Sequence, residues 1–375
     1  MCRLAKENYG NPSSLHALGF EAANLMTDAR RDIESLMYPG GTVIFTSGGT
    51  ESDNMALVSS ARKLRRRGRK IITTKIEHPA VLETCRRLSD DGFAVEFLNV
   101  NRAGCISIDD LRNALTEDTI IVSVMTVNNE TGAIQPVMEA AQAVRDYNKQ
   151  HGTKIIFHTD AVQAFGKIDM RPGRFDLVSV SGHKFHGPKG TGFLYMNKDL
   201  KLPAFITGGG QEDGYRSSTE NTSGIAGLAL AGKMAYQDLD AKMAAMGELN
   251  EMLRAGLMTE LKDVAMNGPA ELGFGLGDSG RRCPSVLNLT FRGTRGEVLL
   301  HTLEQDGIYV STGSACSSHK TGDSHVLQAM GLGHKDIEGA IRFSFSEFNT
   351  RAEIEQVIDR TAAAVRRFRK LGSFR

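Results

Sequence analysis

The chain contains few cysteines, and none of them is spaced like a structural pair. Its 375 residues include no Cys-x-x-Cys sequence, and the five cysteines are Cys2, Cys85, Cys105, Cys283 and Cys316. The odd count and the wide spacings argue against a disulfide framework and against a structural zinc site. In a reducing cytosol, a lone cysteine in an unusual sequence setting is instead a candidate nucleophile.

Long hydrophobic runs and an excess of one charge sign are also missing. No stretch of about 18 apolar residues is present, so no transmembrane helix is predicted. Residues 1–10 contain no apolar stretch of the signal-peptide type. The 45 basic and 44 acidic residues nearly cancel, so the charge gives no indication of nucleic acid or a membrane as a partner. We therefore expect a soluble, cytoplasmic protein.

Short apolar runs alternate with amphipathic stretches in the first half of the chain. The predicted strands are residues 42–46, 70–74, 93–98, 119–125, 154–158, 176–181 and 191–196. Several stretches between them, such as 51–66, 79–88 and 136–149, have hydrophobic residues at helical period. Strands and helices in alternation imply a mainly parallel sheet that is covered on both faces.

The pattern changes after about residue 219. An Ala/Met/Leu-rich helical region runs toward Leu261, and a Gly-rich loop, a strand at 285–291, a helix at 295–305, a strand at 340–345 and a helix at 351–370 follow. We predict a large α/β domain at 1–240 and a smaller α+β C-terminal domain at 241–375. The boundary is expected inside the long helix near residue 240.

A lysine stands just past the predicted strand 176–181. The sequence Ser181-Gly-His-Lys-Phe-His-Gly-Pro-Lys189 places Lys184 where α/β proteins bind ligands. A desolvated lysine with a lowered pKa forms an imine with an aldehyde. Taken alone, the motif is more typical of a solvated turn with a surface lysine.

A glycine-containing turn joins the predicted strand 42–46 to the helix that follows it. The sequence Thr46-Ser-Gly-Gly-Thr-Glu-Ser-Asp-Asn54 combines amide groups at a helix N-terminus with hydroxyl side chains, which is the composition of an anion site. It matches neither the Walker pattern nor the dinucleotide fingerprint. An ordinary capped helix start explains the turn equally well.

Two further strand ends carry an acid and histidines. Asp160, in His158-Thr-Asp-Ala-Val-Gln163, has the position of a residue that pairs with a cofactor ring nitrogen, although a turn-capping aspartate is the common alternative. A zinc cluster of His158, His183 and His186 lacks the helix-borne spacing of hydrolases, so no metal is predicted. His78 opens a predicted helix and suits ring stacking or proton transfer, or a capping or core role.

Small residues surround the last cysteine. Ser311-Thr-Gly-Ser-Ala-Cys-Ser-Ser318 is a poor place for a packing cysteine and a good one for a reactive thiol at Cys316. Arg342, in the predicted strand 340–345, suits bidentate pairing with a carboxylate, and a structural ion pair is equally consistent. The polar sequence Asn128–Gly132 has the composition of a turn.

Together these motifs resemble those of cysteine desulfurases of the NifS/IscS type, in order along nearly the whole chain. Those enzymes are class-V, fold-type-I enzymes that use pyridoxal 5'-phosphate (PLP). The segments that carry the resemblance are Asn11–His16, Thr46–Asn54, Glu77–Leu82, Val127–Gly132, His158–Ala164, Ser181–Gly190, Gly208–Thr219, Ser311–Ser317 and Ile341–Ser346. The short Cys316 loop, followed by residues 324–331, is similar to the NifS/IscS branch rather than to the SufS branch.

The resemblance implies roles for matching residues around the PLP ring. It makes Lys184 the Schiff-base lysine and the base that removes the substrate α-proton. Asp160 holds the pyridinium proton, Gln163 binds the phenolic oxygen, and His78 stacks on the ring and shuttles a proton.

It also implies the anion-binding residues and the nucleophile. The phosphate is assigned to Gly49, Thr50, Ser181 and His183, and to Thr219 from the other subunit of a homodimer. Asn129 and Arg342 take the α-carboxylate of L-cysteine. Cys316 accepts the sulfur as a persulfide and passes it to an iron–sulfur scaffold or a tRNA-thiolation protein, while alanine leaves.

The chain departs from the family pattern in three places. The family usually has a strand and a turn before its Asn-Pro-Ser-Ser segment, whereas ten residues precede Asn11 here. Gly49 and Ser218 stand where the family often has Ala and Gly. The late start motivates one alternative to a desulfurase, a truncated, catalytically impaired homologue in sulfur transfer. The other alternative is a selenocysteine lyase, or another PLP-dependent C–S lyase or aminotransferase, on the same scaffold.

Overall fold

The computed structural model describes residues 1–313 and 322–372, and the chain forms two compact units. The large unit comprises Met1–Leu98, Ile108–Thr126 and Pro136–Leu239, and the small unit comprises Asn99–Ser107, Val127–Gln135 and Asp240–Arg375. Two short segments from the first half of the chain thus belong to the small unit. The predicted strands and helices did not indicate that these two segments belong with the C-terminal part of the chain.

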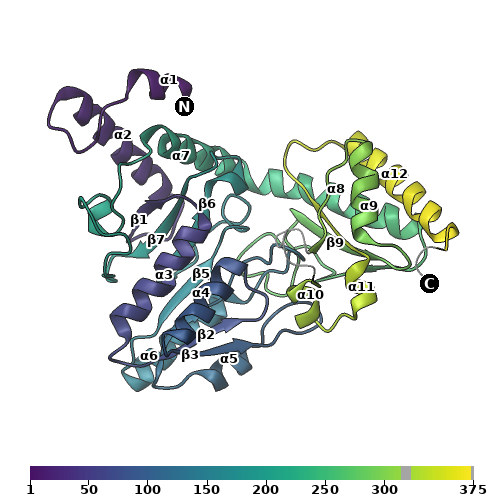
Figure 1. Ribbon diagram of the computed structural model, residues 1–375, viewed down its shortest axis with the longest axis horizontal. Helices are drawn as coiled ribbons and strands as arrows, with labels where there is room; N and C mark the ends of the chain where they lie inside the picture. The colour runs from purple at the N-terminus through teal and green to yellow at the C-terminus, as the bar shows by residue number, and fades with distance from the viewer. Residues whose placement is uncertain (314–321, 373–375) are drawn as a thin grey trace. The chain divides into compact units, whose positions relative to one another are not determined.

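A seven-stranded sheet forms the centre of the large unit (Figure 1). The strands are β1 (Gly41–Thr46), β2 (Lys70–Thr74), β3 (Ala94–Leu98), β4 (Thr119–Ser123), β5 (Ile156–Asp160), β6 (Leu177–Ser181) and β7 (Gly192–Asn197). Their order is β1-β7-β6-β5-β4-β2-β3, and β7 runs antiparallel to both of its neighbours while the other pairs are parallel. The predicted α/β class with a mainly parallel central sheet is confirmed.

Seven helices of the large unit connect or cover these strands. They are α1 (Cys2–Glu7), α2 (Ala17–Glu34), α3 (Gly49–Leu64), α4 (Pro79–Asp90), α5 (Ile108–Ala114), α6 (Val137–His151) and α7 (Thr222–Tyr236). Helix α3 lies against β4, β5, β6 and β7, and its apolar residues form one core with those of α4 and the strands. Met55 and Leu57 of α3 are fully buried in this core, and each such side chain contributes about 2 kcal/mol. The position of α3 on the sheet is therefore fixed by packing.

The carboxyl ends of the parallel strands meet at one edge of this sheet. Because β1, β2, β4, β5 and β6 all run in the same direction, the residues that follow them lie along that edge. Open α/β sheets bind ligands at this edge. The predicted site motifs of the large unit follow β1, β2, β5 and β6, so they are brought together there.

The small unit has its own antiparallel sheet. Its strands are β8 (Val264–Met266), β9 (Val286–Phe291) and β10 (Ala340–Ser344), and their order is β10-β9-β8. Its helices are α8 (Leu239–Glu260), α9 (Gly296–Gln305), α10 (His325–Ala329), α11 (His334–Glu338) and α12 (Arg351–Lys370). The single long helical region predicted toward Leu261 is instead α7 and α8, because Asp238 between them has a left-handed φ of 51°.

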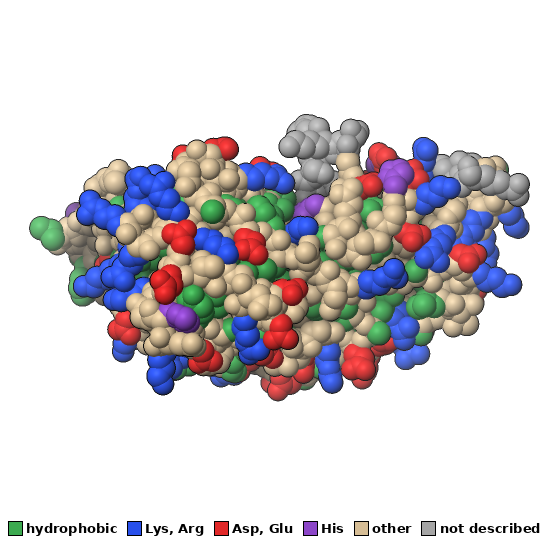
Figure 2. Space-filling model, turned by 90° about the horizontal axis from the view of Figure 1, so that it is seen from below, with side chains coloured by type: hydrophobic (Ala, Val, Ile, Leu, Met, Phe, Trp, Pro, Cys, Tyr) green, Lys and Arg blue, Asp and Glu red, His purple; other side chains and the backbone are tan. Residues whose placement is uncertain are grey.

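Basic and acidic side chains are mixed on the molecular surface. Figure 2 shows Lys and Arg side chains next to Asp and Glu side chains across the visible face, as expected from 45 basic and 44 acidic residues. Among the helices that the structure describes, none is long and apolar enough to cross a membrane.

Candidate active site

A hollow at the N-terminus of α3 has the features of a phosphate site. It has a volume of about 380 Å³, and its lining residues are Ser47, Gly48, Gly49, Thr50, Glu51, Ser181, His183, Lys189 and Gly190. No side chain forms a capping hydrogen bond at the N-cap of α3, so amide groups of its first turn remain available to a ligand. The predicted residues Gly49, Thr50, Ser181 and His183 all line it. A helix N-terminus with hydroxyl and imidazole groups is suited to an anion.

Gly49 allows the start of α3 to approach the turn after β5. A Cβ at this position would lie 2.6 Å from Val162 Cγ2 and 3.4 Å from Ser181 Cβ. A larger residue would therefore push α3 away from β5 and β6. The glycine thus fits the valine that this chain carries at position 162.

The charged groups around the hollow are arranged to favour an anion. Burial and the nearby lysines, Lys184 first among them, lower the pKa of His183, whose Nδ1 lies 2.9 Å from Ser181 Oγ. Glu51 also lines the hollow, but Arg216 donates to it at 2.7 Å and 3.3 Å. Although burial raises the pKa of Glu51, the hydrogen bonds from Arg216 and Ser47 outweigh it and lower the pKa. The charge of Glu51 is thus balanced within the chain.

Asp160 and Lys184 lie at the ends of adjacent strands. Asp160 ends β5 and is buried, and Lys184 lies in the short 3-10 helix η1 (Gly182–Phe185) that follows β6. Burial raises the pKa of Asp160 to about 6, while a 2.8 Å hydrogen bond from the Val162 amide and the charge of Lys184 lower it. The large unit therefore places an ionisable carboxyl group within electrostatic reach of the predicted Schiff-base lysine.

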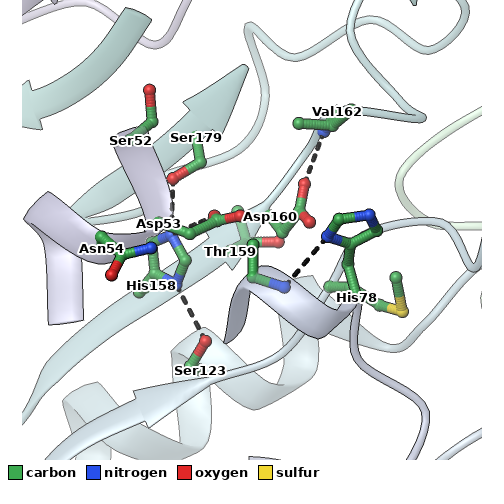
Figure 3. A network of polar contacts seen from close by, with 12 residues as sticks. Ser52, Asp53, Asn54, His78, Ser123, His158, Thr159, Asp160, Val162 and Ser179 are labelled. Atoms are coloured by element: carbon green, nitrogen blue, oxygen red, sulfur yellow. Dashed lines mark hydrogen bonds and ion pairs between the residues drawn. The ribbon is translucent and has the colours of Figure 1, made fainter. Parts of the chain in front are cut away.

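His78 forms the N-cap of α4. Its Nδ1 accepts a 3.1 Å hydrogen bond from the Ala80 amide, which fixes the ring and assigns the proton of the neutral imidazole to Nε2. The capping role that the sequence left open is therefore real. Because His78 follows β2, it lies at the same sheet edge as Asp160 (Figure 3), and capping does not exclude ring stacking.

A buried polar network lies next to Asp160 (Figure 3). His158 Nδ1 lies 2.8 Å from Ser123 Oγ, and its Nε2 lies 2.9 Å from Ser179 Oγ and 3.6 Å from Asp53 Oδ1. Burial lowers the pKa of His158 to about 3. Burial and the charge of Asp160 raise the pKa of Asp53 well above its usual value. Burial thus disfavours a charge on both His158 and Asp53, which lie next to the Asp160 carboxyl group.

Glu77 is a second buried acid that sequence reasoning did not single out. Its Oε1 accepts hydrogen bonds from Thr74 Oγ1 at 2.8 Å and from the Met125 amide at 2.9 Å. These bonds tie the end of β2 to the end of β4. Glu77 immediately precedes His78, so it fixes the backbone from which that ring projects.

Replacement of Glu77 by glutamine is expected to reduce the pH dependence of folding stability. Burial raises the pKa of Glu77 from 4.5 to about 8, so the folded state binds this proton more tightly than the unfolded state. The associated stabilisation is complete below pH 4.5 and is lost as the pH rises through 8. We expect the free energy of unfolding to lose on the order of 5 kcal/mol from this group across that range, and Glu77→Gln to remove this loss.

Denaturant unfolding at several pH values measures this difference. Glu83→Gln is the matched control, because Glu83 lies exposed on α4 in an i,i+3 pair with Arg86. The control is expected to keep the pH profile of the unchanged chain. Parallel profiles for Glu77→Gln and the unchanged chain would contradict a buried, protonated Glu77.

The two predicted carboxylate-binding residues lie together in the small unit. Arg342 on β10 donates from Nη1 to the Asn129 carbonyl at 3.0 Å and from Nη2 to Ser311 Oγ at 3.1 Å. Its buried Nε has no hydrogen-bond partner among the described residues. An oriented guanidinium with an unused donor fits a carboxylate ligand.

The remaining predicted residues have different environments. Gln163 lies half-buried in the turn after Asp160, where Lys167 Nζ is 3.5 Å from its Oε1. Thr219 is exposed before α7 and does not line the phosphate hollow of its own chain. Cys316 lies outside the described residues.

Two of the other cysteines are poorly suited to the role of nucleophile. Cys85, Cys105 and Cys283 are buried, and Cys2 is exposed. Burial raises the pKa of Cys85 to about 12 and that of Cys105 to about 11, so their thiolates are scarce at neutral pH. Within residues 1–313 and 322–372, no three His, Cys, Asp or Glu side chains cluster as metal ligands would.

The chain is similar to known proteins along most of its length. The Aminotransferase class-V profile matches residues 2–357. A curated relative from Clostridium botulinum strain Hall, named cysteine desulfurase IscS, is 41% identical over 94% of this chain and 86% of its own. A solved NifS-like protein has a TM-score of 0.88 and 37% identity, over 97% of this chain and 94% of its own. A structure of SspA in complex with cysteine has a TM-score of 0.77 and 29% identity, and the match covers 92% of this chain and 94% of that one.

The chain belongs to the class-V aminotransferase family and, within it, to the cysteine desulfurases of the NifS/IscS type. The resemblance seen in its sequence is thus confirmed, and so are fold type I and the PLP cofactor. The residues of the large unit fit this cofactor. The hollow at α3 suits its phosphate, Asp160 suits the ring nitrogen, and Lys184 suits its aldehyde.

Proposed function

We propose that this enzyme converts L-cysteine to L-alanine and transfers the sulfur to Cys316. The observation that carries the proposal is the placement of Lys184 and Asp160 at the ends of the adjacent strands β6 and β5, where the charge of Lys184 acts on Asp160, together with the hollow at the N-terminus of α3. L-Cysteine as the substrate is supported by the names of the relatives and by the SspA structure with cysteine.

Each residue of the large unit then has a defined task. PLP, when bound, supplies an electron sink for the bonds at the substrate Cα. Lys184 attaches the cofactor and moves the α-proton. Asp160 keeps a proton on the ring nitrogen, and Asp53 and His158, on which burial disfavours a charge, lie next to it. Thr50, Ser181 and His183 hold the phosphate, Gln163 binds the phenolic oxygen, and His78 covers the ring face.

The small unit supplies the substrate anchor and the sulfur acceptor. Arg342 and Asn129 orient the α-carboxylate. The thiolate of Cys316 attacks the substrate sulfur, so an S–S bond forms while the Cβ–S bond breaks and Cβ gains a proton. Carbon is reduced and sulfur is oxidised within the same pair of reactants, so no outside reductant or oxidant is required.

Loss of the Arg342 guanidinium is expected to weaken substrate binding. Arg342→Ala should raise KM for L-cysteine about thirtyfold, since a charge-assisted hydrogen bond is worth about 2 kcal/mol. The KM of Arg342→Lys should lie between that of the unchanged chain and that of Arg342→Ala, because an ammonium group keeps the charge but does not pair bidentately. The measurement is the initial rate of alanine formation against L-cysteine concentration.

A matched control is Arg351→Ala, because Arg351 is exposed on α12, where it pairs with Glu355. It is expected to leave KM unchanged. An unchanged KM in Arg342→Ala would remove Arg342 from the substrate site.

The partners of the reaction are part of the same proposal. We infer a homodimer in which the exposed Thr219 completes the phosphate site of the partner subunit. The sulfur acceptor is an iron–sulfur scaffold or a tRNA-thiolation protein, and the reaction takes place in the cytoplasm. A purified chain that sediments as a monomer throughout the micromolar range would contradict the dimer.

A further inference from the structure

Glu130 is a buried acid of the small unit that the proposed reaction does not yet use. It lies in the segment Val127–Gln135 and is 5% exposed. Its amide donates to Asn128 Oδ1 at 2.9 Å, and its carbonyl accepts from Asn288 Nδ2 at 3.0 Å. The backbone of Glu130 is therefore fixed on both sides, and its carboxyl group has a defined position.

That carboxyl group lies close to one described residue on each side of the Cys316 segment, Gly313 before it and Ser324 three residues after it. Ser324 Oγ donates to Glu130 Oε2 at 2.5 Å. A Cβ on Gly313 would lie 2.8 Å from the same oxygen and 2.8 Å from Ser324 Cβ, so only glycine leaves room for the carboxyl group. Glu130, Gly313 and Ser324 thus form one buried cluster, which we call the flank clamp.

The flank clamp is continuous with the elements on each side of it. Ser324 is also the N-cap of α10, where its Oγ accepts from the Leu327 amide at 3.2 Å. Two residues before Gly313, Ser311 exchanges backbone hydrogen bonds of 3.1 Å and 2.7 Å with Arg342. Arg342 in turn donates to the carbonyl of Asn129, the residue next to Glu130.

We propose that Glu130 is a positioning residue for sulfur transfer. By holding Gly313 and Ser324 together, next to the Asn129–Arg342 pair, it sets where the Cys316 segment leaves and rejoins the fold relative to the substrate carboxylate. The inference rests on the proposed function, since it gives Glu130 its role through Cys316. Burial raises the pKa of Glu130 to about 7, although the Ser324 hydrogen bond and the charge of Arg342 lower it.

The test compares Glu130→Ala, Glu130→Gln and Ser324→Ala with the unchanged chain, each loaded with PLP. Glu130→Ala is expected to lower kcat about thirtyfold and to change KM for L-cysteine less than about threefold, because the nucleophile is misplaced while the carboxylate anchor stays. Persulfide should form on Cys316 more slowly by the same factor. The visible spectrum of the cofactor should still respond to L-cysteine.

Two further variants separate positioning from a general loss of packing. Glu130→Gln should recover most of the rate, because its amide oxygen accepts the Ser324 hydrogen bond in the same shape. Ser324→Ala should be slowed, and adding it to Glu130→Ala should slow the enzyme no further, since both remove the same contact. Glu338→Gln is the control, because Glu338 pairs with Arg295 at the surface of the small unit and should leave kcat unchanged.

The outcomes distinguish this inference from the proposed function. If Glu130→Ala forms persulfide at the rate of the unchanged chain, the positioning role of Glu130 is overturned and the desulfurase function is not affected. If Glu130→Ala does not fold, Ser324→Ala decides, and an unchanged kcat in that variant would overturn the inference. Failure of the unchanged chain to form alanine and persulfide would instead overturn the desulfurase function.

Discussion

Lys184→Ala is expected to lower the rate of alanine formation about a thousandfold, because one side chain supplies both cofactor attachment and proton transfer at Cα. The structure places Lys184 at the end of β6, where its charge acts on Asp160 at the end of β5. The variant should also lose the visible band of covalently attached PLP. Absorption spectra after gel filtration, with alanine measured in parallel, test both effects.

Lys198→Ala is the matched control for this prediction. Lys198 is exposed just after β7 and does not line the phosphate hollow. It should keep both the visible band and the rate. A Lys184→Ala protein that retains the band and more than about a tenth of the rate would contradict the assignment, because general acid–base catalysis alone is worth more than that.

Cys316→Ala is expected to abolish persulfide formation and to lower alanine formation from L-cysteine at least about a hundredfold. PLP binding and the spectral response to L-cysteine should remain, since the residues that hold cofactor and substrate are unchanged. The buried Cys85 and Cys105, with pKa values raised to about 12 and about 11, offer no substitute thiolate.

Cys2→Ser serves as the control for this variant, because Cys2 is the exposed cysteine among those that the structure describes. It should behave as the unchanged chain. Retained turnover of L-cysteine by Cys316→Ala would exclude the persulfide route. It would favour the alternative of a C–S lyase or selenocysteine lyase, which does not require a thiol at this position.

Much of the large unit could be predicted from its sequence because its strands and helices are encoded locally. The run 70–74 is strand β2 without change, and the predicted run 119–125 contains β4. Helix α2 was missed, although its buried residues, among them Ala22, Met26 and Ile33, recur at helical spacing. The break between α7 and α8 depends on the left-handed backbone at Asp238, and the composition around it continues to favour helix.

Part of the site depends on contacts between distant residues, and these could not be read from local patterns. Asp53 was within the recognised motif Thr46–Asn54, but only the packing of α3 on the sheet shows that it faces His158. Glu130 meets Ser324, which is 194 residues further along the chain. A polar turn was a reasonable interpretation of Asn128–Gly132, because burial of its glutamate follows from the fold of the small unit and not from its neighbours in sequence.

The central claim is tested most directly by a single turnover of the PLP-loaded chain with L-cysteine under anaerobic conditions. Visible absorption, alanine and the mass of the peptide that contains Cys316 are followed together. The account predicts a change in the cofactor spectrum, alanine, and an equal amount of chain with one added sulfur on Cys316. Alanine without sulfur on Cys316, or a chain that PLP does not colour, would contradict it.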